Sequence, residues 1–167
     1  MRRVIVQESD FDATALQRAL YEACAGRAGA IATFTGYVRD HAPDQTTQTL
    51  YLEHYPGMCE RELQEIGDAA MQRWDIGGYV ILHRVGELPR HAQIVFVAAA
   101  SAHRGEAFRA CEYIMDALKT RAPFWKRETL TSGEQFWVQA RDADFDKTRR
   151  WDDAPAAMPP ADQEQEQ

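Results

Sequence analysis

The chain has 167 residues, 45% of them hydrophobic, and a formal net charge of −7. This length and composition support one domain with a core of its own. Residues 152–167 contain five acidic residues and no lysine or arginine, so −5 of the −7 belongs to this stretch and −2 to the rest. A nearly neutral body argues against broad nucleic-acid binding, which requires a basic face.

The cysteines and the apolar runs indicate the cellular compartment. Cys24, Cys59 and Cys111 are far apart, each within a predicted helix. This odd, scattered set is typical of a reducing compartment and predicts neither disulfides nor a zinc site. The apolar runs are shorter than the roughly 18 residues that a membrane span needs. The N-terminal segment also lacks the apolar stretch of a secretory signal. We therefore expect a cytoplasmic protein without a membrane segment.

The first half of the chain predicts alternating strands and helices. Alternation and β-branched or aromatic residues predict strands over 3–7, 30–38 and 49–54, with a polar loop over 41–47. The first helix is capped by Asp10 or Asp12 and ends near Ala25. Its expected inner face consists of Leu16, Leu20 and Ala23. A second helix begins near Pro56. Its apolar residues at helical spacing are Met58, Leu63, Ile66, Ala70 and Trp74.

The second half predicts strands over 79–85 and 93–100, of which the second is nearly all apolar and therefore central. A long helix follows Ser101 and ends near Arg121. Its expected inward residues are Phe108, Cys111, Met115 and Leu118. Two short strands over 124–130 and 134–139 are joined by a turn at Ser132 and Gly133.

The order β-α-β-β-α-β-β-α-β-β predicts an α+β domain with a mixed sheet over residues 1–150. Residues 151–167 are acidic and contain three prolines. This composition predicts a disordered, solubilising tail.

The stretch 119–128 has four basic residues in ten positions of an acidic chain. Pro123 should end the long helix, and Phe124 and Trp125 should anchor the next segment in the core. Lys119 and Lys126 would then lie at a helix end and a strand start, separated by a tight corner. Two ammonium groups held close together repel each other unless an anion lies between them. The stretch therefore predicts a site for an anionic ligand.

Two further segments place basic groups where polar groups converge on ligands. Gly36 and Arg39 end the strand over 30–38, where glycine allows close backbone approach and arginine suits phosphate or carboxylate. His103 and Arg104 begin the long helix, whose N-terminus favours anions.

Each of these basic residues also has a structural explanation. Arg39 could form a surface ion pair, His103 and Arg104 could solvate a helix start, and Lys119 could complement a helix C-terminus. His83 and Arg84 within a strand, and His54, are better explained as structural residues. The combined pattern is what favours a ligand site.

Several familiar active-site patterns are missing from the sequence. It contains no phosphate-binding Gly-x-x-x-x-Gly-Lys-Ser/Thr loop and no Gly-x-Gly-x-x-Gly. It also has no Gly-x-Ser-x-Gly elbow, no His or Cys cluster with metal-ligand spacing, and no cysteine beside an obvious base. We therefore expect no metal and no bound cofactor.

Taken together, these segments resemble the family of large, catalytic subunits of molybdopterin synthase, over residues 2–150. Any one motif is weak, but the ordered set is specific. It consists of Phe34-Thr35-Gly36-Tyr37-Val38-Arg39, Leu52-Glu53-His54-Tyr55-Pro56-Gly57-Met58, His83-Arg84-Val85-Gly86, Ser101-Ala102-His103-Arg104, Lys119, Pro123-Phe124-Trp125-Lys126-Arg127-Glu128 and Trp137.

The resemblance implies an α/β hammerhead fold and a sulfurtransferase that makes the dithiolene of molybdopterin. Its substrate would be cyclic pyranopterin monophosphate, called precursor Z. Sulfur would arrive as a thiocarboxylate on the C-terminal Gly-Gly of a small ubiquitin-like subunit. The assembly implied is a homodimer of large subunits within a heterotetramer.

The resemblance also implies roles for single residues. Lys119 would stabilise charge on the thiocarboxylate or act in proton transfer, and Lys126 would orient substrate and stabilise an anionic intermediate. Substrate contacts are implied for Tyr37, Val38, Arg39, His103, Arg104, Arg127 and Glu128. Arg141 is implied to reach the site of a neighbouring subunit.

Two alternatives from other functional classes stay open at this point. A binding module for a phosphate ligand would have the same cationic pocket without chemistry. A scaffold for a ubiquitin-like partner could have lost catalysis, although the presence of both lysines and Arg39 disfavours it.

Overall fold

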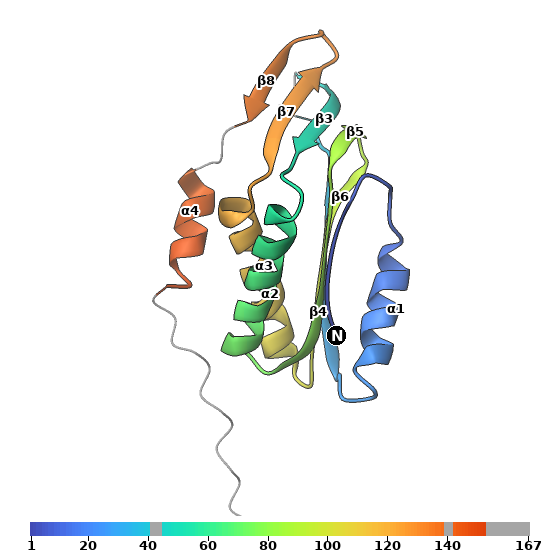
Figure 1. The fold of residues 1–167 in the computed structure, drawn as a ribbon, viewed down its shortest axis with the longest axis vertical. Helices are drawn as coiled ribbons and strands as arrows, with labels where there is room; N and C mark the ends of the chain where they lie inside the picture. Colours follow the sequence, from blue (N-terminus) through green and yellow to red (C-terminus); the bar gives the residue numbers. More distant parts are fainter. Residues whose placement is uncertain (41–44, 139–141, 153–167) are drawn as a thin grey trace, which may run out of the picture.

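The computed structural model describes residues 1–40, 45–138 and 142–152. Its central layer is a four-stranded sheet in the order β1-β4-β6-β2. Its strands are β1 (Arg2–Gln7), β2 (Ala30–Tyr37), β4 (Ile76–Arg84) and β6 (Gln93–Ser101). Helix α1 (Ala13–Ala23) covers one face, and α2 (Met58–Arg73) and α3 (Arg104–Arg121) cover the other (Figure 1). The central position predicted for the apolar strand β6 is confirmed.

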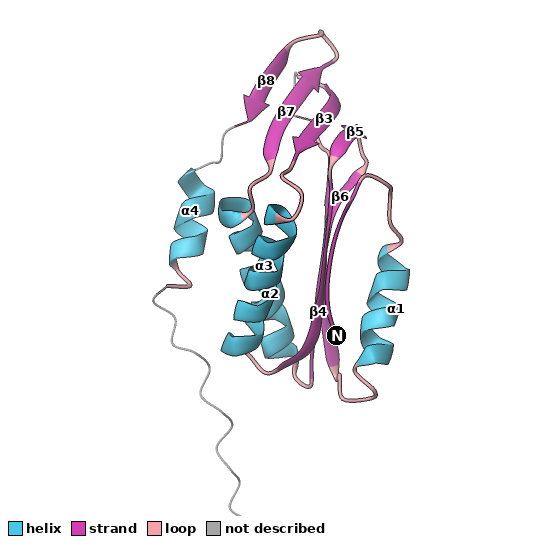
Figure 2. Ribbon diagram, viewed as in Figure 1, coloured by secondary structure: helices cyan, strands magenta, loops and turns pink. Residues whose placement is uncertain are grey.

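A second four-stranded sheet lies at one end of the molecule, in the order β5-β3-β7-β8 (Figure 2). Its strands are β3 (Thr47–Glu53), β5 (Gly86–Pro89), β7 (Trp125–Leu130) and β8 (Gln135–Val138). Helix α4 (Asp142–Arg149) packs on the outside of α3. Neither β5 nor α4 was predicted from the sequence.

The strand pairing confirms an α+β fold with mixed and antiparallel sheets. β1 pairs with β4 in parallel, whereas β6 pairs antiparallel with both β4 and β2. All pairs of the second sheet are antiparallel. The turn predicted between the last two strands is present, with Gly133 at a φ of +88°.

Alternation along the central strands divides the core into two layers. Tyr79 and Ile81 of β4 pack towards α2 and α3, and Val80 and Leu82 pack towards α1. Because both faces of β4 and β6 are covered by helices, these strands are apolar almost throughout.

The predicted inner face of each of three helices includes one residue that is exposed. Ala23, Met58 and Phe108 were expected inside but are exposed, Phe108 by 65%. The buried positions are Cys24, Cys59 and Ala107. One residue on a helix is a rotation of about 100°, which carries a side chain from the core to the surface. Trp125 was also expected in the core, but its side chain is 59% exposed.

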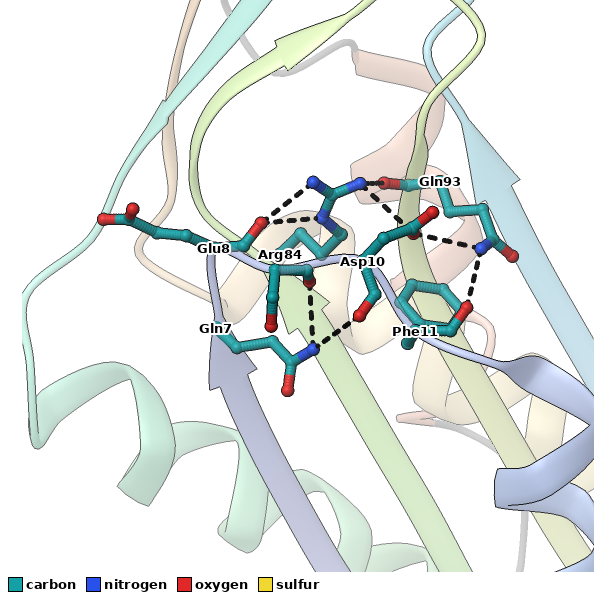
Figure 3. Close-up of polar contacts among 7 residues, drawn as sticks. Gln7, Glu8, Asp10, Phe11, Arg84 and Gln93 are labelled. Atoms are coloured by element: carbon teal, nitrogen blue, oxygen red, sulfur yellow. Dashed lines mark hydrogen bonds and ion pairs between the residues drawn. The ribbon is translucent and has the colours of Figure 1, made fainter.

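Arg84 is a structural residue, as the sequence predicted. The guanidinium of Arg84 is buried and donates to the carbonyl of Glu8 at 2.8 and 3.0 Å and to that of Gln93 at 3.1 Å. Figure 3 shows that it also meets the carboxylate of Asp10, at 3.3 Å. Arg84 therefore ties the loop between β1 and α1 to the start of β6.

Trp151, which was predicted to belong to the tail, is instead packed in the core. Trp151 is 9% exposed and packs edge-on against Trp74 and Tyr113 at ring-centroid distances of 5.5 and 5.6 Å. Its indole nitrogen donates to Asp116 at 2.9 Å. Trp151 thus belongs to the folded body, because an aromatic side chain can bury a large apolar area. Residues 153–167 lie outside the described residues.

Within the described ranges, every helix is too short or too polar to cross a lipid bilayer. The same residues contain no group of three or more His, Cys, Asp or Glu side chains arranged to hold a metal ion.

Candidate active site

A cavity of about 570 Å³ opens where the two sheets meet the C-terminal end of α3. Its walls come from the end of β2, the last turns of α3, and the strands β3, β4, β6, β7 and β8. Apolar side chains form much of the lining, and the cationic groups are Arg39, Lys119 and Lys126. A largely apolar pocket with a few convergent charges is the usual form of a small-molecule site.

The corner predicted between the two lysines is confirmed. Helix α3 ends at Arg121, and β7 begins at Trp125. Lys119 lies in the last turn of the helix, Lys126 is the second residue of the strand, and both line the cavity. Burial lowers the pKa of Lys126, the charge of Lys119 lowers it further, and the charge of Asp144 opposes both. A less basic amine exchanges protons more readily near neutral pH.

The alternation of β7 decides which of its residues reach the cavity. Lys126 and Glu128 face it, and their cross-strand neighbours in β3 are Leu52 and Leu50. Glu128 is buried and accepts a hydrogen bond from the hydroxyl of Thr47.

Arg127 lies on the opposite face of β7, and the expectation that it lines this pocket is corrected. Its guanidinium lies over the rings of Tyr51 and Trp137, at 5.0 and 5.8 Å from the centroids. The physical reason is the two-residue period of a strand, which sends neighbouring side chains to opposite faces.

The end of β2 contributes Tyr37, Val38 and Arg39, all of which line the cavity as predicted. The register of the β2–β6 pair shifts between Gly36 and Tyr37. A Cβ on Gly36 would lie 2.8 Å from a methyl group of Val95, so glycine is needed for close packing here.

The backbone of Val38 is already hydrogen-bonded. Its N–H donates to Ala92 O at 2.9 Å, and its carbonyl accepts from His91 N at 3.1 Å. Its contribution to the cavity is therefore an apolar wall and not a backbone donor.

His103 and Arg104 are not brought to this cavity within one chain. They lie at the N-terminus of α3, whereas Lys119 lies in its last turn. Fifteen residues of helix span roughly 22 Å, so one chain cannot place Arg104 beside Lys119. Arg141, the remaining predicted contact, lies outside the described residues.

Several site features were not anticipated from the sequence. His83 lines the cavity and stacks on Phe124 with a centroid distance of 3.9 Å. Burial lowers the pKa of His83 to about 4, despite an opposing hydrogen bond with the carbonyl of Arg84. The ring is therefore neutral at pH 7. Asp144 was also missed; acidic residues in the first turn of a helix were the available signal.

The thiols of the chain do not take part in this site. Among the described residues that line the cavity there is no cysteine. Burial raises the pKa of Cys59, whose thiol donates to Pro123 O, and that of Cys111 to about 12. Buried thiols with raised pKa values are poor nucleophiles.

The cavity has two amines, a guanidinium and apolar walls, and its carboxylates Asp40 and Glu128 are bonded to Arg90 and Thr47. This lining suits an anionic ligand.

Comparison with known proteins identifies the family. The family model described as MoaE protein matches residues 6–121. A curated relative from Ralstonia nicotianae, named molybdopterin synthase catalytic subunit, is 52% identical over 153 residues, covering 90% of this chain and 85% of the relative. A relative of the same name from Escherichia coli is 52% identical over 123 residues, covering 74% of this chain and 81% of its own.

Solved structures agree with the sequence comparison. The molybdopterin biosynthesis MoaE protein from Burkholderia ambifaria superposes with a TM-score of 0.77 at 44% identity, covering 91% of this chain and 99% of its own. Molybdopterin synthase from Staphylococcus aureus gives a TM-score of 0.74 at 28% identity, with 83% and 98% coverage. The chain belongs to the MoaE family, the family of its relatives named molybdopterin synthase catalytic subunit.

Proposed function

We propose that this cavity transfers sulfur from the C-terminal thiocarboxylate of a small ubiquitin-like subunit to cyclic pyranopterin monophosphate, which yields the dithiolene of molybdopterin. The observation that carries the proposal is the pair Lys119 and Lys126 in one pocket whose described lining has no thiol. The sulfur must then come from outside the chain. The relatives' name, catalytic subunit, also implies a second kind of subunit.

The two lysines have different positions and therefore different proposed roles. Lys119 has a side chain that is 47% exposed at the rim, where an incoming carrier terminus would arrive. It would stabilise the negative charge of the thiocarboxylate. Lys126 is more buried, and its lowered pKa suits an amine that orients substrate and exchanges a proton with an anionic intermediate.

The number of sulfur atoms in the product requires two carrier molecules. A thiocarboxylate that loses its sulfur and is hydrolysed by water leaves a carboxylate, so each carrier supplies one sulfur atom. A dithiolene contains two, and two carrier molecules are consumed for each product. Arg39 on the same wall is proposed to bind the substrate phosphate, for which a guanidinium is well shaped.

His103, Arg104 and Arg141 are proposed to act in the pocket of a second copy of the chain, in a homodimer within a heterotetramer. The support for His103 and Arg104 is their position at the far end of α3 from Lys119. We further propose a cytoplasmic site of action, which the three free, buried cysteines support.

Lys119→Ala tests catalysis against the alternative of a binding module. We expect the rate of molybdopterin formation to fall about 100-fold or more, because a charge-stabilising group is lost. Binding of the small subunit, measured by calorimetry, should be retained. An unchanged rate would remove Lys119 from the mechanism. Substrate binding without turnover by the parent protein would instead favour the binding module.

A further inference from the structure

The carboxylate of Asp144 lies beside Lys119, one of the two lysines that line the cavity. Its Oδ1 is 3.5 Å from the Nζ of Lys119, and its side chain is only 18% exposed. Its charge also acts on Lys126, where it opposes the effects of burial and of Lys119. One carboxylate therefore balances two amines that would otherwise repel each other.

The fold holds Asp144 in this place through α4. Asp144 lies in the first turn of the helix, where a negative charge is favoured by the helix dipole. Further along α4, Thr148 donates to Asp116 O at 3.2 Å and contacts the hydroxyl of Thr120 at 3.0 Å. The helix is followed by Trp151, which is anchored in the core.

The other charged groups around the cavity have their own partners. Asp40 is held by Arg90 at 2.6 Å, and this contact lowers the pKa of Asp40. Glu128 on β7 is bonded to Thr47. On α3, Asp116 binds Arg150 at 2.7 Å and the indole of Trp151.

Two more of the described titratable groups line the cavity with the lysines. His83 on β4 is neutral, and Arg39 at the end of β2 adds positive charge. On α4 itself, Asp146 pairs with Arg149 at 3.2 Å on the exposed side of the helix. Asp144 is thus the carboxylate that α4 contributes to the lysine pair.

We propose that Asp144 is a positioning residue for sulfur transfer, which fixes the ammonium of Lys119 and supplies the counter-charge that lets Lys119 and Lys126 share one pocket. The inference rests on the proposed function and adds a residue to it. It also gives α4 a role, because the helix connects an anchor in the core to the rim of the site.

The test compares Asp144→Asn with Asp144→Glu and with the matched control Asp146→Asn, which lies on the exposed side of the same helix. For Asp144→Asn we expect kcat to fall about tenfold, since Lys119 loses its fixed position. The lysine-dependent limb of the pH profile should move to lower pH, because removal of a negative charge favours the neutral amine. Asp144→Glu should restore most of the rate and return the limb towards its original position. Asp146→Asn should match the parent in both.

A second readout is independent of turnover. Acylation of the Lys126 amine at neutral pH, followed by mass spectrometry, should be at least about twofold faster in Asp144→Asn than in the parent. A parent protein without turnover would contradict the sulfurtransferase, while this labelling difference would still support the charge coupling. Superimposable pH profiles and equal labelling rates for Asp144→Asn and the parent would overturn the proposal. So would an equal response of Asp146→Asn, or a collapse of Tm in Asp144→Asn that makes the role structural.

Discussion

At the scale of single residues, the proposed role of Lys126 can be separated from any contribution to stability. Its lowered pKa means that the folded protein disfavours the charged amine. We predict that Lys126→Met, which keeps the stem and removes the charge, leaves Tm unchanged or slightly higher. Its rate of product formation should fall about 100-fold. Calorimetric unfolding and the conversion assay measure the two effects, and a large fall in Tm would mark Lys126 as structural.

We predict that His83 makes the folded protein less stable at acidic pH. Its pKa is lowered to about 4 in the folded protein by burial, so the unfolded chain binds a proton at higher pH than the folded one does. The neutral His83 side chain therefore costs no stability above about pH 6.5. As the pH falls from 6.5 towards 4, the free energy of unfolding decreases, because the unfolded chain gains a proton that the folded protein does not bind. The loss amounts to at most about 3 kcal/mol in the free energy of unfolding.

His83→Asn, which cannot titrate, should therefore show a flatter decline of stability between pH 6.5 and 4 in urea unfolding. His91→Asn provides the control, because His91 is exposed and asparagine tolerates its positive φ. Equal slopes for His83→Asn and the parent protein would contradict the assignment of a buried neutral imidazole.

At the scale of elements, α4 depends on the aromatic anchor that follows it. We predict that Trp151→Ala lowers the free energy of unfolding by about 3 kcal/mol, because it empties the space between Trp74 and Tyr113. It should also lower activity, since Asp144 would lose its fixed position. Phe145→Ala is the control, because Phe145 on the same helix is 42% exposed. Similar losses of stability and activity in both variants would contradict a specific role of the Trp151 anchor.

Most helices and strands could be predicted from the sequence because their hydrophobic patterns extend over many residues and are regular. The apolar run of β6 and the helical spacing of α3 left little ambiguity. Strand β5 was missed because four residues between Gly86 and Pro89 carry too little pattern, and α4 because its stability comes from tertiary contacts.

In the site, too, the features set by local sequence could be predicted, whereas those set by tertiary packing could not. The Lys119–Lys126 corner followed from Pro123, a local signal that ends a helix. The direction and the distance of side chains within one chain could not be predicted. Arg127 points away because strand faces alternate, and Arg104 lies a helix length from Lys119. Neither fact can be obtained from composition, because both depend on how the elements pack.

At the scale of the whole molecule, the separation of Arg104 from Lys119 predicts sites shared between two copies. Lys119→Ala and Arg104→Ala should each be inactive alone. When the two are unfolded, mixed in equal amounts and refolded, half of the dimers are hybrids with one intact site. About one quarter of the parent activity should then return. No recovery in dimers shown to be mixed would place Arg104 outside the shared site.

The sulfurtransferase itself is tested most directly by conversion in vitro. The protein would be mixed with precursor Z and a small subunit bearing a C-terminal thiocarboxylate, and molybdopterin would be followed as its fluorescent oxidised derivative. We predict product only when all three are present, with two carriers consumed for each product. Product formed without this protein, or no product while precursor Z remains bound to it, would contradict the account.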